Sequence, residues 1–283
     1  MYLATVRSEG GETAVVVDGD RGLAAVADVV PGAPATALGV IESVAERDFV
    51  QAVRSAPDSA FSPVGDTVFT APYTRPRKIW GIGLNYVEHA SDLTESVPEE
   101  PASFMKGDHT IIGPGDAIPL PRQSDRVTAE GELGVVIGRE CRDVGEDAAL
   151  DHVWGVCTIL DQTAEDILAR NPRFLTRSKN FPGFFSFGPA IVPLSEVLAA
   201  AGRLADLEVA TVLNGADHRV NTVAHMRYSP EFLVAFHSQV MPLFPGDIIS
   251  TGTPGAAHIR PGDVAGCRIP GVGELSNPVV QGP

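Results

Sequence analysis

The sequence predicts a β-dominated α+β protein, and three observations support this fold class. Short apolar segments of strand length recur along the chain, clusters of Gly, Pro, Asn and Asp separate them, and few stretches carry apolar residues at helical spacing. The chain has 283 residues, with 29 Gly, 23 Pro and a hydrophobic fraction of 44%. This length and composition indicate a globular protein with one large or two unequal domains.

Residues 1–72 are predicted to form a small, β-rich accessory domain. Residues 2–7 and 13–18 are strand candidates joined by a Gly-Gly turn. One helix is predicted over residues 35–56, because apolar residues recur there at helical spacing. The predicted core-facing stripe consists of Leu38, Ile41, Val44, Ala45, Phe49 and Val53.

Residues 73–283 are predicted to form a second, larger domain that is also dominated by strands. The linker before it, residues 71–78, carries two prolines and the cations Arg75, Arg77 and Lys78, which we expect to be solvated. Two short helices are expected, at residues 163–170 and 229–241. The strand candidates are residues 78–83, 132–138, 152–160, 207–213, 246–251 and 264–270.

Charge and composition argue against several classes of protein. The net charge is −15 and no basic block is present, so binding to nucleic acid is not expected. The first residues lack a basic segment followed by an apolar one, and no run approaches the roughly 18 apolar residues of a spanning helix. We therefore expect a cytoplasmic protein. The three cysteines, Cys141, Cys157 and Cys267, are far apart in sequence and are interpreted as small buried hydrophobic residues.

The segment of residues 129–138 carries the first candidate site. Glu130 and Glu132 are two residues apart in a predicted strand, so both carboxylates face the same side. Their Cα atoms would lie roughly 6.6 Å apart, and two unit charges at that distance repel by about 2.5 kcal/mol at an effective dielectric constant near 20. The opposite face, with Leu133, Val135 and Ile137, is expected to be buried. The pair therefore needs either solvent or a cation.

Asp161 is the third candidate carboxylate, because it ends one apolar strand and precedes a short helix. Three carboxylates on rigid elements, without His or Cys at ligand spacing, form an all-oxygen site of the kind that Mg²⁺ or Mn²⁺ prefers. Asp161 could instead be the N-cap of the following helix.

A second group of candidates surrounds residues 81–93. A strand is expected to give way there to a helix that presents His89 and Asp92 three residues apart, so the carboxylate can orient the imidazole as a general base. His89 could also be an ordinary surface histidine. The glycines of this segment lack the third member of a dinucleotide fingerprint, since Tyr86 stands in its place.

Two further segments offer groups that can bind an anion. Lys179 precedes an aromatic stretch, residues 181–189, whose rings could shield its ammonium group. Thr251 and Thr253 lie in a turn where backbone donors and a hydroxyl could hold a carboxylate.

The order of these segments resembles the fumarylacetoacetate hydrolase family. The likeness covers about residues 76–280 and depends on GIGLNYVEHASD, PASFMKGDHTIIGPGDAIPLP, AEGELGVVIG, the Asp161 turn, RSKNF and PGDIISTGTPG in this order. It implies a mixed β-roll catalytic domain, a homodimer, and a Mg²⁺ or Mn²⁺ ion held by Glu130, Glu132 and Asp161.

The resemblance also implies roles for the remaining candidates. Substrates of the family are short 2-oxo acids, often acylpyruvates. His89 with Asp92 would activate water, Lys179 would support the enolate, and Thr253 and Tyr86 would contact the substrate.

The leading hypothesis is therefore a metal-dependent hydrolase of C–C bonds in acylpyruvate-type acids. The alternatives are an oxaloacetate-type decarboxylase, a hydroxydienedioate isomerase, or a protein that binds a 2-oxo acid without turnover. The sequence departs from the family pattern at Asp92, at Leu160, where the family has an amide, and at Glu165, where it has an arginine.

Overall fold

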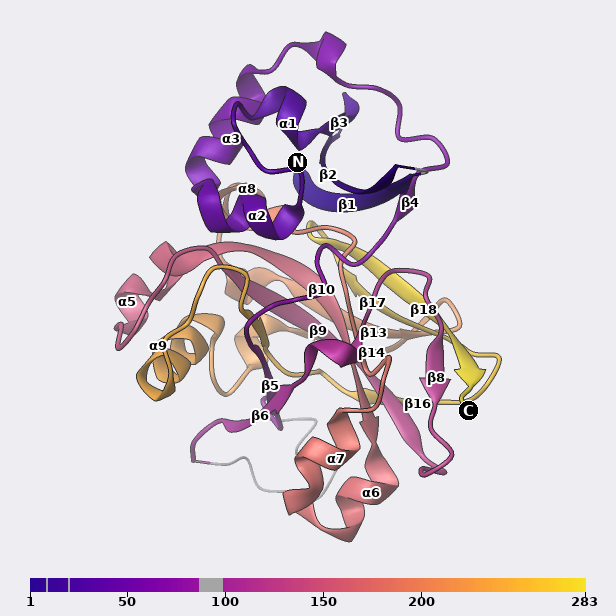
Figure 1. The fold of residues 1–283 in the computed structure, drawn as a ribbon. Helices are drawn as coiled ribbons and strands as arrows, with labels where there is room; N and C mark the ends of the chain where they lie inside the picture. The colour runs from indigo at the N-terminus through magenta and orange to yellow at the C-terminus, as the bar shows by residue number, and fades with distance from the viewer. Residues whose placement is uncertain (9, 20, 87–98) are drawn as a thin grey trace.

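The computed structural model describes residues 1–8, 10–19, 21–86 and 99–283, and it has an N-terminal unit and a larger second unit (Figure 1). The N-terminal unit contains a four-stranded sheet in the order β3-β2-β1-β4. Its elements are β1 (Tyr2–Ser8), β2 (Gly11–Asp18), β3 (Gly22–Ala25), α1 (Val26–Val29), α2 (Ala37–Ser43), α3 (Glu46–Ser55) and β4 (Val68–Phe69). The two strands predicted here are confirmed.

The single helix predicted over residues 35–56 is wrong, because the chain forms two helices. Val44 has an extended backbone and Ala45 has a ψ of 141°, so neither residue is helical, and the two separate α2 from α3. The Val44 carbonyl accepts a hydrogen bond of 3.1 Å from the indole N–H of Trp154, which ties the break to the second unit. Ile41, Phe49 and Val53 are buried as predicted, but Ala45 is exposed.

A nine-stranded sheet forms the centre of the second unit. Its main path has the order β6-β5-β15-β9-β10-β11-β7, while β12 pairs with β10 and β16 pairs with β9. The sheet is mixed, because β15 runs parallel to β5 and antiparallel to β9. Its strands are β5 (Ile79–Gly83), β6 (Ala102–Lys106), β7 (Ile111–Ile112), β9 (Val127–Ile137), β10 (Val153–Ala164), β11 (Phe185–Phe187), β12 (Val192–Pro193), β15 (Ile248–Ser250) and β16 (Ala256–Ile259).

A five-stranded sheet in the order β14-β13-β17-β18-β8 packs against this central sheet. Its strands are β8 (Ile118–Leu120), β13 (Glu208–Leu213), β14 (Ala216–Thr222), β17 (Val264–Ile269) and β18 (Gly273–Gln281). All six strands predicted for the second unit are present. The β-dominated α+β fold class is therefore confirmed.

Helices lie around the two sheets and are short. They are α5 (Glu146–Ala149), α6 (Glu165–Arg170), α7 (Leu175–Lys179), α8 (Leu194–Ala201) and α9 (Pro230–Val240). The 3-10 helices are Asp58–Ala60, Asp108–Thr110, Leu150–His152, Pro172–Phe174, Leu204–Asp206 and Val223–His225. Both predicted helices are present as α6 and α9. No helix in the described part of the chain is long and apolar enough to cross a membrane.

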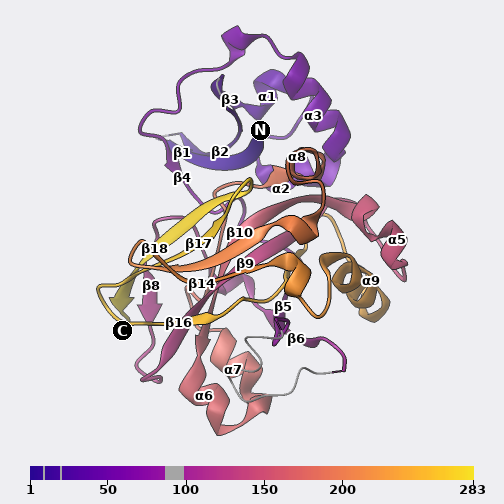
Figure 2. The same cartoon turned by 180° about the vertical axis from the view of Figure 1, so that it is seen from behind.

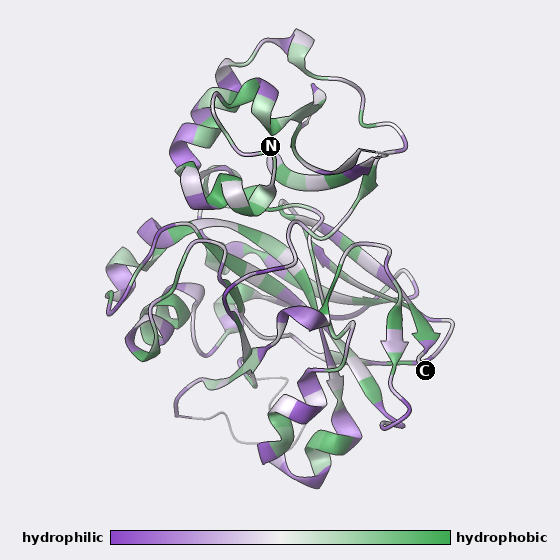
Figure 3. Cartoon of the chain, in the orientation of Figure 1, coloured by the Kyte–Doolittle hydropathy of each residue, from purple (hydrophilic) through white to green (hydrophobic). Residues whose placement is uncertain are grey.

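Two hydrophobic cores meet at the central sheet, whose strands β9 and β10 are largely apolar (Figure 3). One core fills the space between the two sheets of the second unit and contains Leu133, Val135, Ile137 and Leu160. Three of these residues, Leu133, Val135 and Ile137, were predicted to be buried, and each is 0% exposed. Cys141, Cys157 and Cys267 are buried free thiols, as expected.

The second core joins the N-terminal unit to the central sheet. Phe49 packs on Trp154 with 5.1 Å between ring centroids, and both belong to a core that also contains Val136 and Ile159 of the central sheet. Leu3 and Ile191 exchange backbone hydrogen bonds of 2.8 and 2.9 Å. Figure 2 shows α8 at this junction, beside α2 and α3. The two units therefore share one apolar interior.

The linker was expected to be solvated, and for Lys78 this is wrong. The Lys78 ammonium lies 2.7 Å from the Asp247 carboxylate, which is completely buried. Asp247 also accepts hydrogen bonds from the backbone N–H groups of Lys78 and Phe244, at 2.9 and 2.8 Å. This buried ion pair attaches the start of β5 to the turn before β15.

We predict that Asp247→Ala destabilises the protein by about 3–5 kcal/mol, because it leaves the ammonium group of Lys78, whose side chain is 11% exposed, without its carboxylate partner. Urea unfolding measures this change. Glu12→Ala is the matched control, because Glu12 pairs with Arg7 at the surface, where an ion pair contributes less than about 1 kcal/mol. Equal losses in the two variants would contradict the structural role given to Asp247.

Candidate metal centre

The pairing of β9 with β10 brings three carboxylates together. Glu130 lies directly opposite Asp161 in the antiparallel register, and Glu132 lies opposite Ile159. One oxygen from each of Glu130, Glu132 and Asp161 lies within 4.8 Å of the others. The prediction that Glu130 and Glu132 face the same side is confirmed. Asp161 is not a helix N-cap, because β10 continues to Ala164 before α6 begins.

The residues on the opposite face of β9 and β10 explain why the carboxylates face away from the core. Gly131 points to the opposite face, where an added Cβ atom would lie 2.8 Å from the carbonyl oxygen of Ala210 on β13. Glycine therefore allows the five-stranded sheet to approach β9 directly behind the carboxylates. Leu133 and Leu160 occupy the same opposite face and anchor it in the core.

Glu132 is the most enclosed glutamate of the triad. It is 1% exposed, and one of its oxygens accepts hydrogen bonds from the Ser250 hydroxyl at 2.5 Å and the Gly252 N–H at 2.8 Å. Gly252 has a φ of +99°, and an added Cβ would lie 2.8 Å from the Cβ of Asn85, so this turn requires glycine. Burial and the charges of Asp161 and Glu130 raise the pKa of Glu132.

Two lysines compensate part of this negative charge. Lys179 lies 2.6 Å from Oδ2 of Asp161 and 3.0 Å from Glu130, while Lys106 lies 2.5 Å from Oδ1 of Asp161. Glu130 also accepts a hydrogen bond of 2.7 Å from the Thr163 hydroxyl. Three carboxylates face two ammonium groups, so the buried cluster has an excess of negative charge when all five groups are ionised.

Lys106 was not predicted from the sequence. Its only local signal is alternation in β6, which places Lys106 on the face opposite the exposed Met105. The ring that lies over the Lys179 ammonium is also unexpected: it is Phe104 of β6, at 4.7 Å. The aromatic residues that follow Lys179 pack elsewhere, with Phe184, Phe185 and Phe187 inside the two cores.

Two of the other predicted site residues, Tyr86 and Thr253, are buried. Tyr86 is completely buried, and its hydroxyl has no hydrogen-bond partner among the described residues. Burial raises the pKa of the Tyr86 hydroxyl, and the negative charge of Glu132 raises it further. The Thr253 hydroxyl donates to the carbonyl of Gly255 at 3.1 Å, and that of Thr251 donates to the carbonyl of Leu133 at 2.8 Å. His89 and Asp92 lie outside the described residues.

Two departures from the family pattern do not disturb the carboxylate face. Leu160 is fully buried in the core between the sheets, on the side of β10 away from Asp161. Glu165 forms an ion pair of 2.6 Å with Arg126 near the surface. The donor set of the triad is therefore intact.

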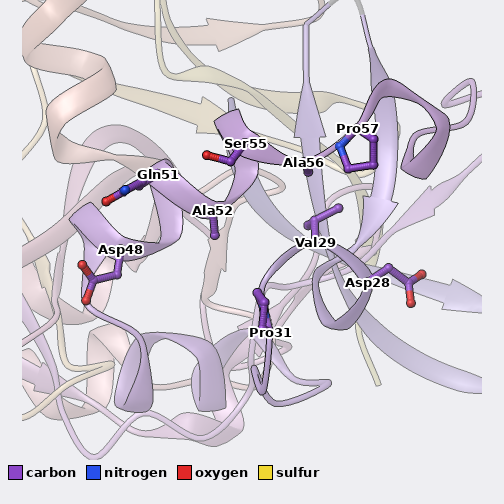
Figure 4. A pocket seen from close by; sticks show the side chains of 9 residues that line it. All are labelled: Asp28, Val29, Pro31, Asp48, Gln51, Ala52, Ser55, Ala56 and Pro57. Atoms are coloured by element: carbon purple, nitrogen blue, oxygen red, sulfur yellow. The ribbon is translucent and has the colours of Figure 1, made fainter.

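A groove on the N-terminal unit, with a volume of about 420 Å³, lies between the α1 region and α3 (Figure 4). It includes no His, Cys or Lys, and its two carboxylates stand at opposite ends of the groove in Figure 4. It lacks the converging groups of a catalytic site. The lining residues are Asp28, Val29, Pro31, Asp48, Gln51, Ala52, Ser55, Ala56 and Pro57.

The sequence matches the family model of the fumarylacetoacetate hydrolase C-terminal domain over residues 78–280. The chain therefore belongs to the fumarylacetoacetate hydrolase family. It is 35% identical over 219 residues to the mitochondrial oxaloacetate tautomerase fahd2 of Xenopus laevis, a match that covers 74% of this chain and 67% of that protein.

Two solved structures have a similar fold over almost the whole chain. One is maleylpyruvate hydrolase from Sphingobium sp. SYK-6 in complex with manganese(II) and pyruvate, with 27% identity, a TM-score of 0.82 and coverage of 100% of both chains. The other is 5-carboxymethyl-2-hydroxymuconate delta-isomerase from Mycobacterium smegmatis, with 29% identity, a TM-score of 0.76 and coverage of 99% of both chains.

We predict that Glu132→Gln removes the rise in melting temperature that Mn²⁺ produces. A cation present at 100 times its Kd stabilises a protein by about 2.7 kcal/mol, and losing one carboxylate ligand should abolish most of this effect. In chelator the variant should melt at the wild-type temperature or above it, because a buried charge has been removed.

Differential scanning calorimetry with and without chelator makes this measurement. Glu274→Gln, which changes an exposed glutamate of β18, is the control and should respond to Mn²⁺ like the wild type. An unchanged response in Glu132→Gln would remove this residue from the metal centre.

Proposed function

We propose that this protein is a divalent-metal-dependent hydrolase that cleaves a C–C bond in acylpyruvate-type 2-oxo acids. The observation that carries the proposal is the buried triad of Glu130, Glu132 and Asp161, whose oxygens lie within 4.8 Å of one another beside two lysines. A divalent cation on the triad, together with the two ammonium groups, would supply the positive charge that stabilises an enolate.

The residues present fit a Mg²⁺ or Mn²⁺ ion. All three donors are carboxylate oxygens, which both ions prefer, and no His or Cys ligand stands in the group. A relative of the same fold is described in complex with manganese(II) and pyruvate. When bound, the cation supplies positive charge to the oxygens of a chelated 2-oxo acid.

The residues of the chain then have distinct tasks. His89, oriented by Asp92, takes a proton from water, and the hydroxyl adds to the distal carbonyl carbon. The C–C bond to the pyruvyl group breaks, its electron pair becomes the pyruvate enolate, and a proton completes pyruvate. Lys179 supports the enolate charge, and Thr253 and Tyr86 contact the substrate. Support for His89 and Asp92 comes from their spacing of three residues and from the family resemblance.

Isomerisation or tautomerisation of a 2-oxo acid is the second candidate function. Two similar proteins carry such names, an oxaloacetate tautomerase and a hydroxymuconate delta-isomerase. These reactions need the same enolate stabilisation but no attacking water. Decarboxylation of oxaloacetate would also need enolate stabilisation at this site. A protein that binds a 2-oxo acid without turnover would need only the affinity of the site for its ligand.

A panel of acylpyruvates, oxaloacetate and hydroxydienedioates, assayed with Mg²⁺, Mn²⁺ or chelator, tests the proposal by product analysis. Cleavage of an acylpyruvate to pyruvate and a carboxylic acid is expected. If the only products were isomers of the substrates, isomerisation or tautomerisation would be favoured. Turnover that persists in the presence of chelator would contradict the metal requirement.

The homodimer and the cytoplasmic location stay predictions.

We predict that His89→Ala lowers the rate of hydrolysis by about 10² to 10⁴, the usual cost of losing a positioned general base. Affinity for Mn²⁺, measured by calorimetry, should be unchanged, because His89 is not among the proposed ligands. His225→Ala, at an exposed histidine, is the control. Hydrolysis by His89→Ala within about threefold of the wild type would mean that another group activates water.

A further inference from the structure

The two lysines of the metal centre come from elements that lie far apart in the sheet order. Lys106 ends β6, and three strands separate β6 from β10, which carries Asp161. In a flat sheet this separation would be about 19 Å, far beyond the reach of a lysine side chain. Since Lys106 nevertheless lies 2.5 Å from Asp161, the sheet curls and the two strands face each other across its concave side.

Asn180 joins the ends of β6 and α7, which lie near each other in both views (Figures 1 and 2). Its Oδ1 accepts a hydrogen bond of 2.8 Å from the N–H of Gly107, and its Nδ2 donates to the carbonyl of Met105 at 3.2 Å. Met105 and Gly107 are the two neighbours of Lys106, and Asn180 itself follows Lys179. One side chain therefore fixes the backbone on both sides of Lys106 next to the end of α7.

The two ammonium groups have different surroundings. The side chain of Lys106 is 0% exposed and, among the described residues, forms an ion pair with one carboxylate, Asp161, whereas Lys179 bridges Asp161 and Glu130. Lys106 is thus committed to one oxygen, and Lys179 is shared between two carboxylates.

We propose that Lys106 is a positioning residue for the carboxylate triad and that Asn180 couples its placement to that of Lys179. Lys106 holds Oδ1 of Asp161, so that Oδ2 faces Lys179, which also binds Glu130. Asn180 has no hydrogen bond to a carboxylate among the described residues and acts through the backbone of β6. The inference rests on the proposed function, because it concerns how the metal centre is held in shape.

A double-mutant cycle with Asn180→Ala and Lys106→Met tests the proposal, with Mn²⁺ affinity measured by calorimetry on the full chain. Loss of a residue that orients a metal ligand weakens metal binding by about 10- to 100-fold, and each single variant should show a loss in this range. The double variant should lose no more than Lys106→Met alone, because both changes disturb the same lysine.

Asn171→Ala is the matched control. Asn171 lies on the segment between α6 and α7, and its side chain accepts a hydrogen bond from the N–H of Arg173, which is also outside β6. Its Mn²⁺ affinity should stay within about twofold of the wild type. An unchanged affinity in Asn180→Ala, or a loss in the double variant equal to the product of the two single losses, would overturn the proposal.

Two outcomes separate this proposal from the proposed function. If the wild type bound no Mn²⁺, the proposed function would fail, and the cycle would be repeated on the free energy of unfolding in chelator, where additive effects would overturn the coupling. If Lys106→Met did not fold, Asn180→Ala would be compared directly with Asn171→Ala. The Asn180 side chain lies outside the core, so this variant should fold, and a loss below tenfold would overturn the proposal.

Discussion

Two lysines lie against three carboxylates on one face of the central sheet, and the pairing of β9 with β10 must keep these five charges together. The register of β9 and β10 places Glu130 opposite Asp161, and Glu132 is buried two pairs further along, opposite Ile159. A slip of one residue would turn these side chains into the apolar core. The long pairing of the two strands and the glycine between the glutamates therefore protect the site as well as the fold.

The face of the central sheet that carries the carboxylates has a polar part and an apolar part. Near Glu130 and Asp161 it is polar, whereas Val136 and Ile159 on the same face belong to the core shared with the N-terminal unit. The N-terminal unit thus covers the part of this face that carries no charge. Residues 1–72 were predicted as an accessory domain, and their packing on β10 gives them a structural link to the strand that carries Asp161.

Local patterns predicted the parts of the site that depend on one strand. The two-residue spacing of Glu130 and Glu132 was sufficient to place both carboxylates on one face, and the alternating apolar residues that follow, Leu133, Val135 and Ile137, predicted the buried face behind. Asp161 was ambiguous, because a carboxylate between a strand and a helix also suits an N-cap. In the structure β10 pairs with β9 as far as Ala164, so Asp161 lies inside the strand and is not an N-cap. This pairing joins residues far apart in the sequence, so no local pattern contains it.

Other features depend on contacts that no local pattern contains. Lys106 reaches Asp161 only because the sheet curls, and the hydrogen bond from Trp154 to Val44 marks the break of the helix predicted over residues 35–56. Anomalous diffraction from crystals grown with Mn²⁺ would show whether the triad holds one divalent cation. We expect one strong peak bonded to Glu130, Glu132 and Asp161. A peak bonded to other residues, or none at saturating Mn²⁺, would mean that these carboxylates are not the ligands.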